Sequence, residues 1–127
     1  MTEILNFIDG NWIEPAVSGH VDVVDPATGL VLAKTPLCGP AEVTAAAEAA
    51  ARALPAWRAT PVQERVQYLF GMRDLLRSHL DEIARTITTE AGKTLEESKA
   101  EMTRAIENVE VACGMPALAK GELPTGR

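Results

Sequence analysis

Residues 94–113 constrain the fold more than any other stretch of the chain, because they read as one helix with two different faces. At 3.6 residues per turn, one stripe of this helix carries apolar or small side chains and is expected to face a core. The stripe consists of Leu95, Ser98, Met102, Ile106, Val109 and Cys113. The opposite face, which we call the polar row, consists of Glu97, Glu101, Arg104 and Asn108. Other elements must therefore cover the stripe, and the polar row is the part of the helix that could carry chemistry.

The start of this helix is marked by the sequence TLEE at residues 94–97, which is typical of a capping box. In such a box the threonine hydroxyl accepts a backbone N–H of the first turn, and the glutamate three residues later accepts the N–H of the threonine. Gly92 is expected to end the preceding helix. The run GKT at residues 92–94 imitates the end of a phosphate-binding loop, but it lacks the upstream glycine and the preceding strand that such loops need. A helix end is therefore favoured.

Two further helical regions precede this junction. An alanine-rich run predicts a helix over residues 40–52, which begins at Pro40, where a missing N–H is harmless, and is stopped by Pro55. The sequence TPVQ at residues 60–63 predicts the start of the next helix, with Thr60 as its cap and Pro61 as its first residue.

The second of these regions keeps the helical period of apolar residues as far as Ile87. Ser78, with Asp81 three residues later, predicts a new cap, so that two helices follow in series. The helix over residues 94–113 is expected to end near Gly114, and a shorter turn is expected over residues 117–120.

The first 36 residues predict a β region made of two hairpins. Asp9-Gly10 favours a tight two-residue turn between short apolar segments. The run DPATG at residues 25–29 predicts a second turn, because proline fixes φ and glycine accepts a positive φ. It joins a strand over residues 21–24 to a partner strand over residues 30–35, which Pro36 closes.

The predicted fold class is α+β, with β hairpins in residues 1–36 and three to four helices in a helical part over residues 40–120. One domain is expected, because the chain has 127 residues and 46% of them are hydrophobic, which is enough for a modest core. Residues 121–127 are turn-rich and contain no closing element, so we expect a further strand to follow them.

Composition and charge exclude several classes of function. The net charge of -6 and the lack of a Lys/Arg cluster argue against binding to nucleic acid. No apolar run is long enough to span a membrane, and residues 1–5 do not resemble a leader peptide, so a cytoplasmic location is expected. The two cysteines are far apart and have no metal-ligand or disulfide spacing.

The cysteines and histidines are predicted to be structural. Cys113 belongs to the apolar stripe, which favours a packed thiol. Cys38 lies in a turn before a helix, and neither His20 nor His79 is tied to it by spacing. Two unrelated histidines do not make a metal site. We expect no catalytic, cofactor-binding or metal-binding residue among them.

Arg104 is the one candidate for a functional side chain, and two interpretations stay open. It could be a solvated arginine that pairs with Glu101 or Glu107, each three residues away on the helix. Alternatively, it could project into a cleft formed with another domain and hold a carboxylate by two parallel hydrogen bonds.

Four stretches of the sequence resemble a known family. FIDGNW, VVDPATG, ALPAWRATPVQERV and EAGKTLEESKAEMTRAIENVEVACGMPALAKGE are similar to the N-terminal part of aldehyde dehydrogenases. The likeness covers nearly all of the chain and is greatest to the CoA-acylating methylmalonate-semialdehyde dehydrogenases. Ala105 and Val111 depart from this subgroup, which often has glycine and an aromatic residue at these positions.

The resemblance implies a fold and an activity. The chain would be an incomplete N-terminal portion of an α/β aldehyde dehydrogenase, with the catalytic domain and most of the NAD-binding domain beyond it. The subgroup oxidises a semialdehyde with NAD through a cysteine thioester, loses the substrate carboxylate as bicarbonate and passes the acyl group to CoA, as in valine catabolism. The expected partners are the remainder of the enzyme and further copies of it in a homo-oligomer. The chain alone is expected to be inactive.

The resemblance also assigns a role to the polar row. Arg104 matches the helix arginine that the subgroup uses near the substrate carboxylate, which supports the cleft interpretation. Asn108, one turn further on, could line the same space. Neither Cys38 nor Cys113 matches the nucleophile's motif, and no residue matches the nicotinamide-binding loops.

Two other functions remain as alternatives. The chain could belong to an aldehyde dehydrogenase that does not use CoA. It could also be a free-standing helical module that binds another protein chain. Because a part that normally packs against other domains exposes a large apolar surface, we expect the isolated chain to associate at high concentration.

Overall fold

Two compact units make up the protein in the computed structural model, which describes residues 2–118 and 121. Unit 1 comprises residues 1–59 with residues 89–92, and unit 2 comprises residues 60–88 with residues 93–127. The last two residues of the turn predicted over residues 117–120 and the tail over residues 122–127 lie outside the described residues.

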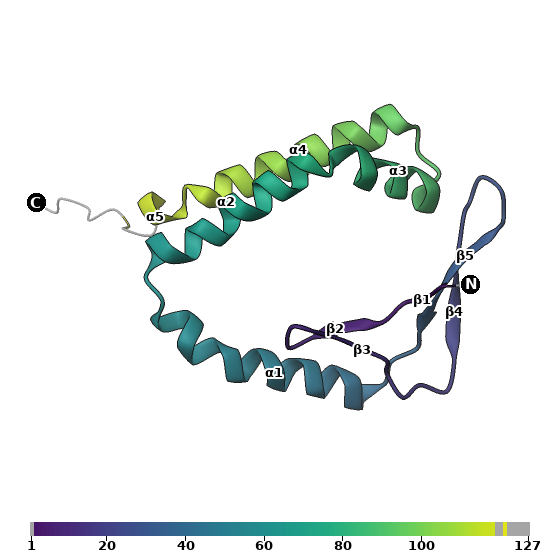
Figure 1. The fold of residues 1–127 in the computed structure, drawn as a ribbon, viewed down its shortest axis with the longest axis horizontal. Helices are drawn as coiled ribbons and strands as arrows, with labels where there is room; N and C mark the ends of the chain where they lie inside the picture. Colours follow the sequence, from purple (N-terminus) through teal and green to yellow (C-terminus); the bar gives the residue numbers. More distant parts are fainter. Residues whose placement is uncertain (1, 119–120, 122–127) are drawn as a thin grey trace, which may run out of the picture. The chain divides into compact units, whose positions relative to one another are not determined.

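Unit 1 holds all five described strands. Their bounds are β1 Thr2–Glu3, β2 Asn6–Ile8, β3 Asn11–Ile13, β4 His20–Val24 and β5 Val31–Pro36. β4 pairs antiparallel with β5, and β1 joins the other edge of β5 in parallel, so that the order is β1-β5-β4. β2 and β3 form a separate antiparallel hairpin (Figure 1). Both predicted hairpins are confirmed, whereas the parallel strand β1 was not predicted.

The turn of the β2–β3 hairpin has the geometry that its sequence predicts. Asp9 and Gly10 have positive φ angles of 54° and 76° and connect the paired residues Ile8 and Asn11. The hairpin is stabilised by Phe7 and Trp12, which are directly opposite each other with their ring centroids 4.9 Å apart.

The turn between β4 and β5 is organised by one carboxylate. Asp25 accepts the N–H of Ala27 at 2.8 Å and the hydroxyl of Thr28 at 2.9 Å, and these bonds hold the pKa of its carboxyl below its ordinary value. Gly29 closes the turn with a φ of 73°, and its N–H donates to the carbonyl of Asp25. The predicted turn is confirmed.

Helix α1 (Pro40–Ala59) corrects one prediction. It begins at Pro40 as expected, but it continues through Pro55 and ends seven residues later than the predicted Arg52. A proline inside a helix removes one hydrogen bond and costs about 3 kcal/mol relative to alanine. Alanine has the highest helix propensity, and the residues before Pro55 are rich in it. The helix therefore continues through Pro55 despite the missing hydrogen bond.

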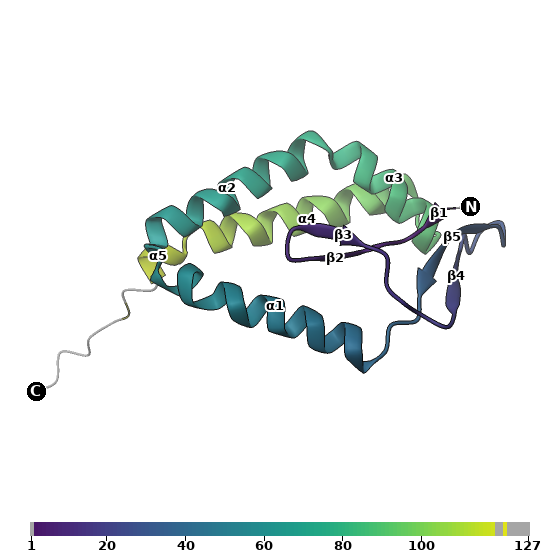
Figure 2. The same ribbon diagram turned by 60° about the horizontal axis from the view of Figure 1, so that its bottom comes forward.

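Unit 2 consists of packed helices. Their bounds are α2 Val62–Ser78, α3 Leu80–Ala91, whose last turn belongs to unit 1, α4 Leu95–Cys113 and α5 Met115–Leu118. In both views α2 and α4 lie side by side and run in opposite directions (Figures 1 and 2). An ion pair of 2.6 Å between Arg77 Nη2 and Glu110 Oε1 connects these two helices. The residue before α2 is Pro61, not Thr60, so the predicted start of this helix is wrong by one residue.

The break between α2 and α3 is confirmed, but its predicted cap is wrong. Ser78 is the last residue of α2, and its hydroxyl donates back to the carbonyl of Leu75. His79 links the two helices: its N–H donates to Leu75, and its carbonyl accepts the N–H of Ile83. A serine hydroxyl can bond the carbonyl three or four residues back, and this bond forms here in place of a cap.

The core of unit 2 lies beneath the predicted stripe of α4. Ser98, Met102 and Ile106 are buried, together with Val66 of α2 and Ala84 of α3. The buried hydroxyl of Ser98 is satisfied by Thr88 Oγ1 at 2.9 Å and by the carbonyl of Thr94 at 3.1 Å. The prediction of a core-facing stripe on this helix is therefore confirmed.

The α+β class is confirmed, with short strands followed by five helices where three to four were predicted. The additional helix is α5, which begins two residues earlier than the predicted turn. None of the helices within the described ranges is long and apolar enough to cross a bilayer.

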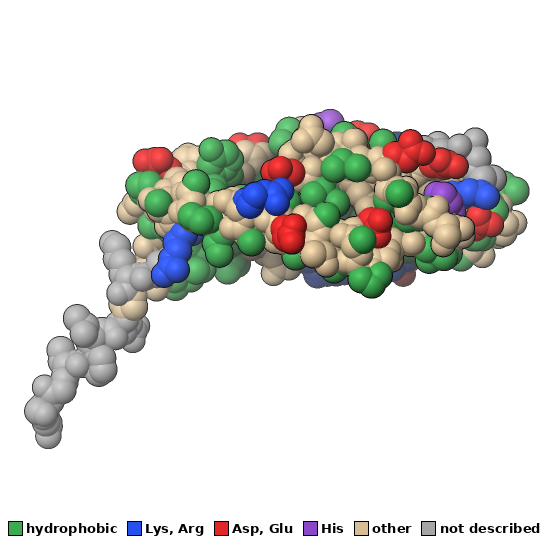
Figure 3. All heavy atoms as spheres, turned by 90° about the horizontal axis from the view of Figure 1, so that it is seen from below, with side chains coloured by type: hydrophobic (Ala, Val, Ile, Leu, Met, Phe, Trp, Pro, Cys, Tyr) green, Lys and Arg blue, Asp and Glu red, His purple; other side chains and the backbone are tan. Residues whose placement is uncertain are grey.

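Much apolar surface is exposed. On the face drawn in Figure 3, apolar side chains reach the surface between isolated acidic and basic ones. Within unit 2, an open groove of ≈ 570 Å³ lies over α2 and the start of α3. We call it the apolar groove; its lining includes Tyr68, Met72, Leu75, Leu76, His79 and Ile83.

Gly92 is predicted to be required for the end of α3. It has a φ of 69°, and a Cβ added to it would lie 2.9 Å from the Pro26 ring. Gly92→Ala should destabilise the chain by about 1–3 kcal/mol, measured by urea unfolding, because it combines backbone strain with a steric clash. Gly71→Ala is the control: its Cβ would meet no atom within 4 Å, so the same change inside α2 should stabilise by roughly 0.5–1 kcal/mol. Equal effects of the two changes would contradict this role of Gly92.

The isolated chain is predicted to associate through the apolar groove. Leu75 is 63% exposed there, and Leu75→Glu should shift association to higher protein concentration in sedimentation velocity. Leu54→Glu in α1 is a matched control, because Leu54 is similarly exposed, at 57%, and does not line the groove. A wild-type chain that stays monomeric at high concentration would contradict the prediction.

Candidate functional site

The candidate site is the polar row of α4 and the loop that precedes this helix. The packing of the stripe on α2 and α3 turns the polar row away from the core of unit 2. Arg104 and Asn108 are both exposed, and they are one helical turn apart. The sequence predicts these two side chains as site residues, and both lie on the exposed face of the helix.

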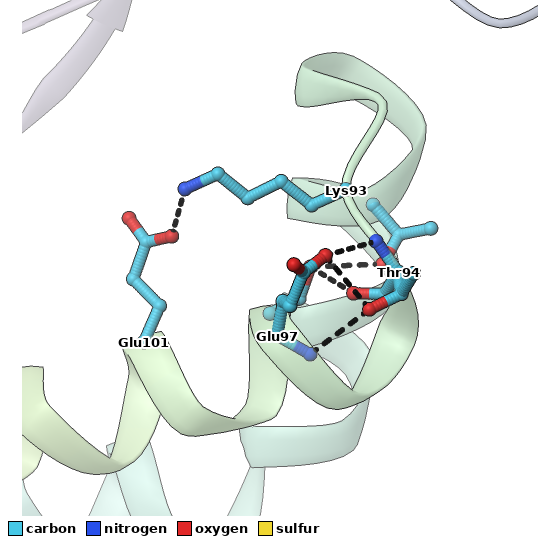
Figure 4. Close-up of polar contacts among 6 residues, drawn as sticks. Lys93, Thr94, Glu97 and Glu101 are labelled. Atoms are coloured by element: carbon cyan, nitrogen blue, oxygen red, sulfur yellow. Dashed lines mark hydrogen bonds and ion pairs between the residues drawn. The ribbon is translucent and has the colours of Figure 1, made fainter.

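The loop before α4 is held by the predicted capping box, which is fully formed (Figure 4). The N–H of Glu97 donates to Thr94 Oγ1 at 3.3 Å, and Glu97 Oε2 accepts the N–H of Thr94 at 3.0 Å and its hydroxyl at 2.8 Å. These bonds, led by the one from the Thr94 backbone, hold the pKa of the Glu97 carboxyl below its ordinary value. The start of α4 is therefore closed by its own side chains.

Lys93 and Glu101 form an ion pair that was not predicted. The ammonium of Lys93 reaches from the loop to Glu101 Oε2 on the second turn of α4 (Figure 4). The hydrogen bond from Lys93, with the charge of Lys93 after it, holds the pKa of the Glu101 carboxyl below its ordinary value. Both side chains remain more than 40% exposed. Periodicity could not reveal this pair, because Lys93 lies outside the helix and the two residues are eight positions apart.

Arg104 has no hydrogen bond or ion pair with any residue that the structure describes. Its charge contributes to the lowered pKa of Glu101, but the carboxylate of Glu101 is bonded to Lys93. The interpretation in which Arg104 pairs with Glu101 or Glu107 is thus not observed. A guanidinium presents five N–H donors in a planar fork that matches a carboxylate. The arrangement is therefore suited to bind an anion from outside the chain.

The other residues considered from the sequence do not converge on this site. Cys113 is partly buried, as its place on the stripe predicts, and Cys38 is exposed and accepts a hydrogen bond from Asn6 Nδ2 at 3.2 Å. His79 Nδ1 contacts Glu82 Oε2 at 2.9 Å beside the apolar groove. Among the described residues, no group of three or more His, Cys, Asp or Glu could hold a metal ion.

The comparisons with known proteins agree on one family. The sequence pattern of the aldehyde dehydrogenase family matches residues 12–126. A malonate-semialdehyde dehydrogenase of Listeria monocytogenes is 43% identical over 120 residues, which are 94% of this chain and 25% of that protein. The mitochondrial methylmalonate-semialdehyde dehydrogenase [acylating] of Arabidopsis thaliana is 43% identical over 117 residues, which are 92% of this chain and 19% of that protein.

A solved structure gives the same result in three dimensions. An enzyme of Sinorhizobium meliloti complexed with NAD superimposes with a TM-score of 0.91 at 32% identity, over 100% of this chain and 26% of that one. The chain belongs to the aldehyde dehydrogenase family. Its most similar relatives include malonate- and methylmalonate-semialdehyde dehydrogenases, and it spans about a quarter or less of their length.

Four carboxyl groups, one of them in the capping box, predict how the stability of the chain depends on pH. The pKa values of Asp25, Asp81, Glu97 and Glu101 are all lowered in the folded chain. A carboxyl with a lowered pKa stabilises the fold above its unfolded pKa, about 4, and this stabilisation is lost as the pH falls through the folded pKa. Urea unfolding should therefore show decreasing stability from about pH 5 downwards.

Glu97→Gln tests the contribution of the box to this dependence. The variant should be less stable than the wild type at pH 7, and the difference should shrink as the pH falls and the Glu97 carboxyl becomes protonated. Glu96→Gln is the control, because Glu96 lies in the same first turn but outside the box. If the difference in the free energy of unfolding between Glu97→Gln and the wild type did not change with pH, the contribution assigned to the capping box would be contradicted.

Proposed function

We propose that this chain contributes the substrate-carboxylate-binding arginine, Arg104, to an NAD-dependent, CoA-acylating malonate- or methylmalonate-semialdehyde dehydrogenase. The observation that carries the proposal is the exposed guanidinium of Arg104, which no described residue occupies. The names of the relatives support the substrate class, because malonate and methylmalonate semialdehydes both carry a carboxylate besides the aldehyde.

In this proposal Arg104 holds the substrate carboxylate by two parallel hydrogen bonds. Such bonds fix the orientation of a short substrate, and so direct its aldehyde carbon towards the reacting groups. Asn108 lies one turn further along the same face and supplies an amide that can donate to the same carboxylate. A substrate that lacks the carboxylate would gain nothing from either side chain.

NAD and CoA are cosubstrates of the proposed enzyme, and we assign their sites to the remainder of it. The run GKT at residues 92–94, which imitates the end of a phosphate-binding loop, ends one helix and caps the next. The N–H of Thr94 is bonded to Glu97 and is therefore not open to a phosphate. The use of NAD is supported by the bound NAD in the Sinorhizobium meliloti enzyme, and that of CoA by the word acylating in the name of the Arabidopsis relative.

The remaining parts of the proposal concern the whole enzyme. Residues 1–127 would form its N-terminal part, with the β hairpins and helices packing on domains that carry the nucleophilic cysteine. The complete enzyme would be a homo-oligomer in the cytoplasm. The purified 127-residue chain would then neither reduce NAD nor form a thioester.

A second candidate function is favoured by the apolar groove. A free-standing helical module would use this groove to bind another protein chain.

An aldehyde dehydrogenase that does not use CoA would share Arg104 but release a free acid. Consumption of CoA during turnover distinguishes this last alternative from the main proposal.

The role of Arg104 is tested in the enzyme that contains this chain. Arg104→Gln should raise KM for malonate semialdehyde about ten- to a hundredfold, which corresponds to roughly 1.5–3 kcal/mol for hydrogen bonds to a charged group. KM for propanal, which has no carboxylate, should stay unchanged. Arg104→Lys should recover part of the loss, because it keeps the charge but not the fork. Equal effects on both aldehydes would contradict the proposal.

A further inference from the structure

A potential competitor for the substrate lies within reach of Arg104. Glu101 precedes Arg104 by three residues on α4, and side chains at this spacing are neighbours on a helix surface. An ionised glutamate there can occupy the donors of the guanidinium as a substrate carboxylate would. Arg104 could then bind an external anion only after displacing Glu101.

The structure shows that Glu101 is engaged elsewhere. Its Oε2 accepts a hydrogen bond from the ammonium of Lys93, while Arg104 makes no hydrogen bond or ion pair within the described ranges. Figure 4 shows Lys93 extended from the loop over the first turn of α4 towards Glu101. Glu101 is thus bonded to Lys93, and Arg104 has no carboxylate partner among the described residues.

The backbone of Lys93 is held on both sides. Gly92, with a φ of 69°, ends α3 before it, and Thr94 opens the capping box of α4 after it. The backbone position from which the Lys93 side chain extends is therefore fixed between the end of α3 and the start of α4. Glu97, one turn before Glu101, does not compete for Lys93, because its carboxylate is bonded to Thr94.

We propose that Lys93 is a positioning residue that draws Glu101 away from Arg104 and so keeps the guanidinium open for a carboxylate-bearing substrate. This inference rests on the proposed function of Arg104. It adds that selectivity for the substrate carboxylate depends on a side chain outside the helix, which does not itself touch the substrate.

The charges around Glu101 are consistent with such a balance. Lys93 and, more weakly, Arg104 both lower the pKa of Glu101, so the competitor is ionised at neutral pH. Both members of the Lys93–Glu101 pair are partly exposed, and pairs of this kind are weak. Removal of Lys93 should therefore redistribute Glu101 towards Arg104 and weaken substrate binding about two- to threefold, as expected for a helix-surface pair.

The first experiment uses the 127-residue chain and NMR. The Arg104 Nε–H signal is followed from pH 7 to pH 3 in the wild type and in Lys93→Gln. In Lys93→Gln this signal should move at least about twice as far as in the wild type, because Glu101 then contacts Arg104. Glu107 also lies three residues from Arg104, but its titration contributes equally in both proteins. Lys99→Gln is the matched control, since it removes an equal charge from α4 but Lys99 pairs with Asp81 at 2.9 Å. An equal shift in all three proteins would overturn the inference.

The second experiment measures steady-state kinetics of the enzyme that contains this chain. Lys93→Gln should raise KM for malonate semialdehyde about two- to threefold with little change in kcat, and it should leave KM for propanal unchanged. Addition of Glu101→Gln should restore KM, because the competitor is then neutral. Lys93→Arg, which keeps the cation, should behave like the wild type. A raised KM that Glu101→Gln does not restore would overturn the inference, because it would assign the effect to the charge of Lys93 alone.

The two experiments separate failure of this inference from failure of the proposed function. If Arg104→Gln affects both aldehydes equally, the role of Arg104 in the proposed function is wrong, whatever the NMR titration shows. If Arg104→Gln is selective for the carboxylated aldehyde but Lys93→Gln changes neither the NMR shift nor KM, only the positioning role of Lys93 is wrong.

Discussion

The packing of the α4 stripe on α2 and α3 is the interaction on which the rest of unit 2 depends. Ser98, Met102 and Ile106 are buried at this contact. The hydroxyl of Ser98 is hydrogen-bonded to Thr88 and to the carbonyl of Thr94, so the buried contact leaves no polar group of this side chain unpaired. Because one face of the helix is fixed in this way, the direction of the opposite face is fixed as well. The exposure of Arg104 is thus a consequence of core packing.

The junction between α3 and α4 gives this helix a defined start. Gly92 provides the positive φ that ends one helix, and Thr94 with Glu97 satisfies the first donors of the next. Lys93 lies between these two signals and makes a long-range contact instead of a local one. A three-residue loop therefore combines two structural roles with one side chain that reaches the candidate site.

Membership of the aldehyde dehydrogenase family agrees with the large exposed apolar surface. Three large apolar or aromatic side chains of α2 that line the apolar groove are exposed to solvent: Tyr68, Met72 and Leu75. The chain spans about a quarter of the length of the Listeria relative, so most of such a protein has no counterpart in these residues. Both observations fit helices and hairpins that pack on further domains.

The local elements could be predicted from the order of the residues. The Asp9-Gly10 turn, the Asp25 turn, the Gly92 helix end and the capping box each depend on residues close together in the chain. The end of α1 was predicted wrongly at Pro55, because the high helix propensity of the alanine-rich residues before it outweighs one lost hydrogen bond. The parallel pairing of β1 with β5 and the ion pair between Lys93 and Glu101 are visible only in the folded chain. These contacts join residues outside any common helix or hairpin, and periodicity carries no information about them.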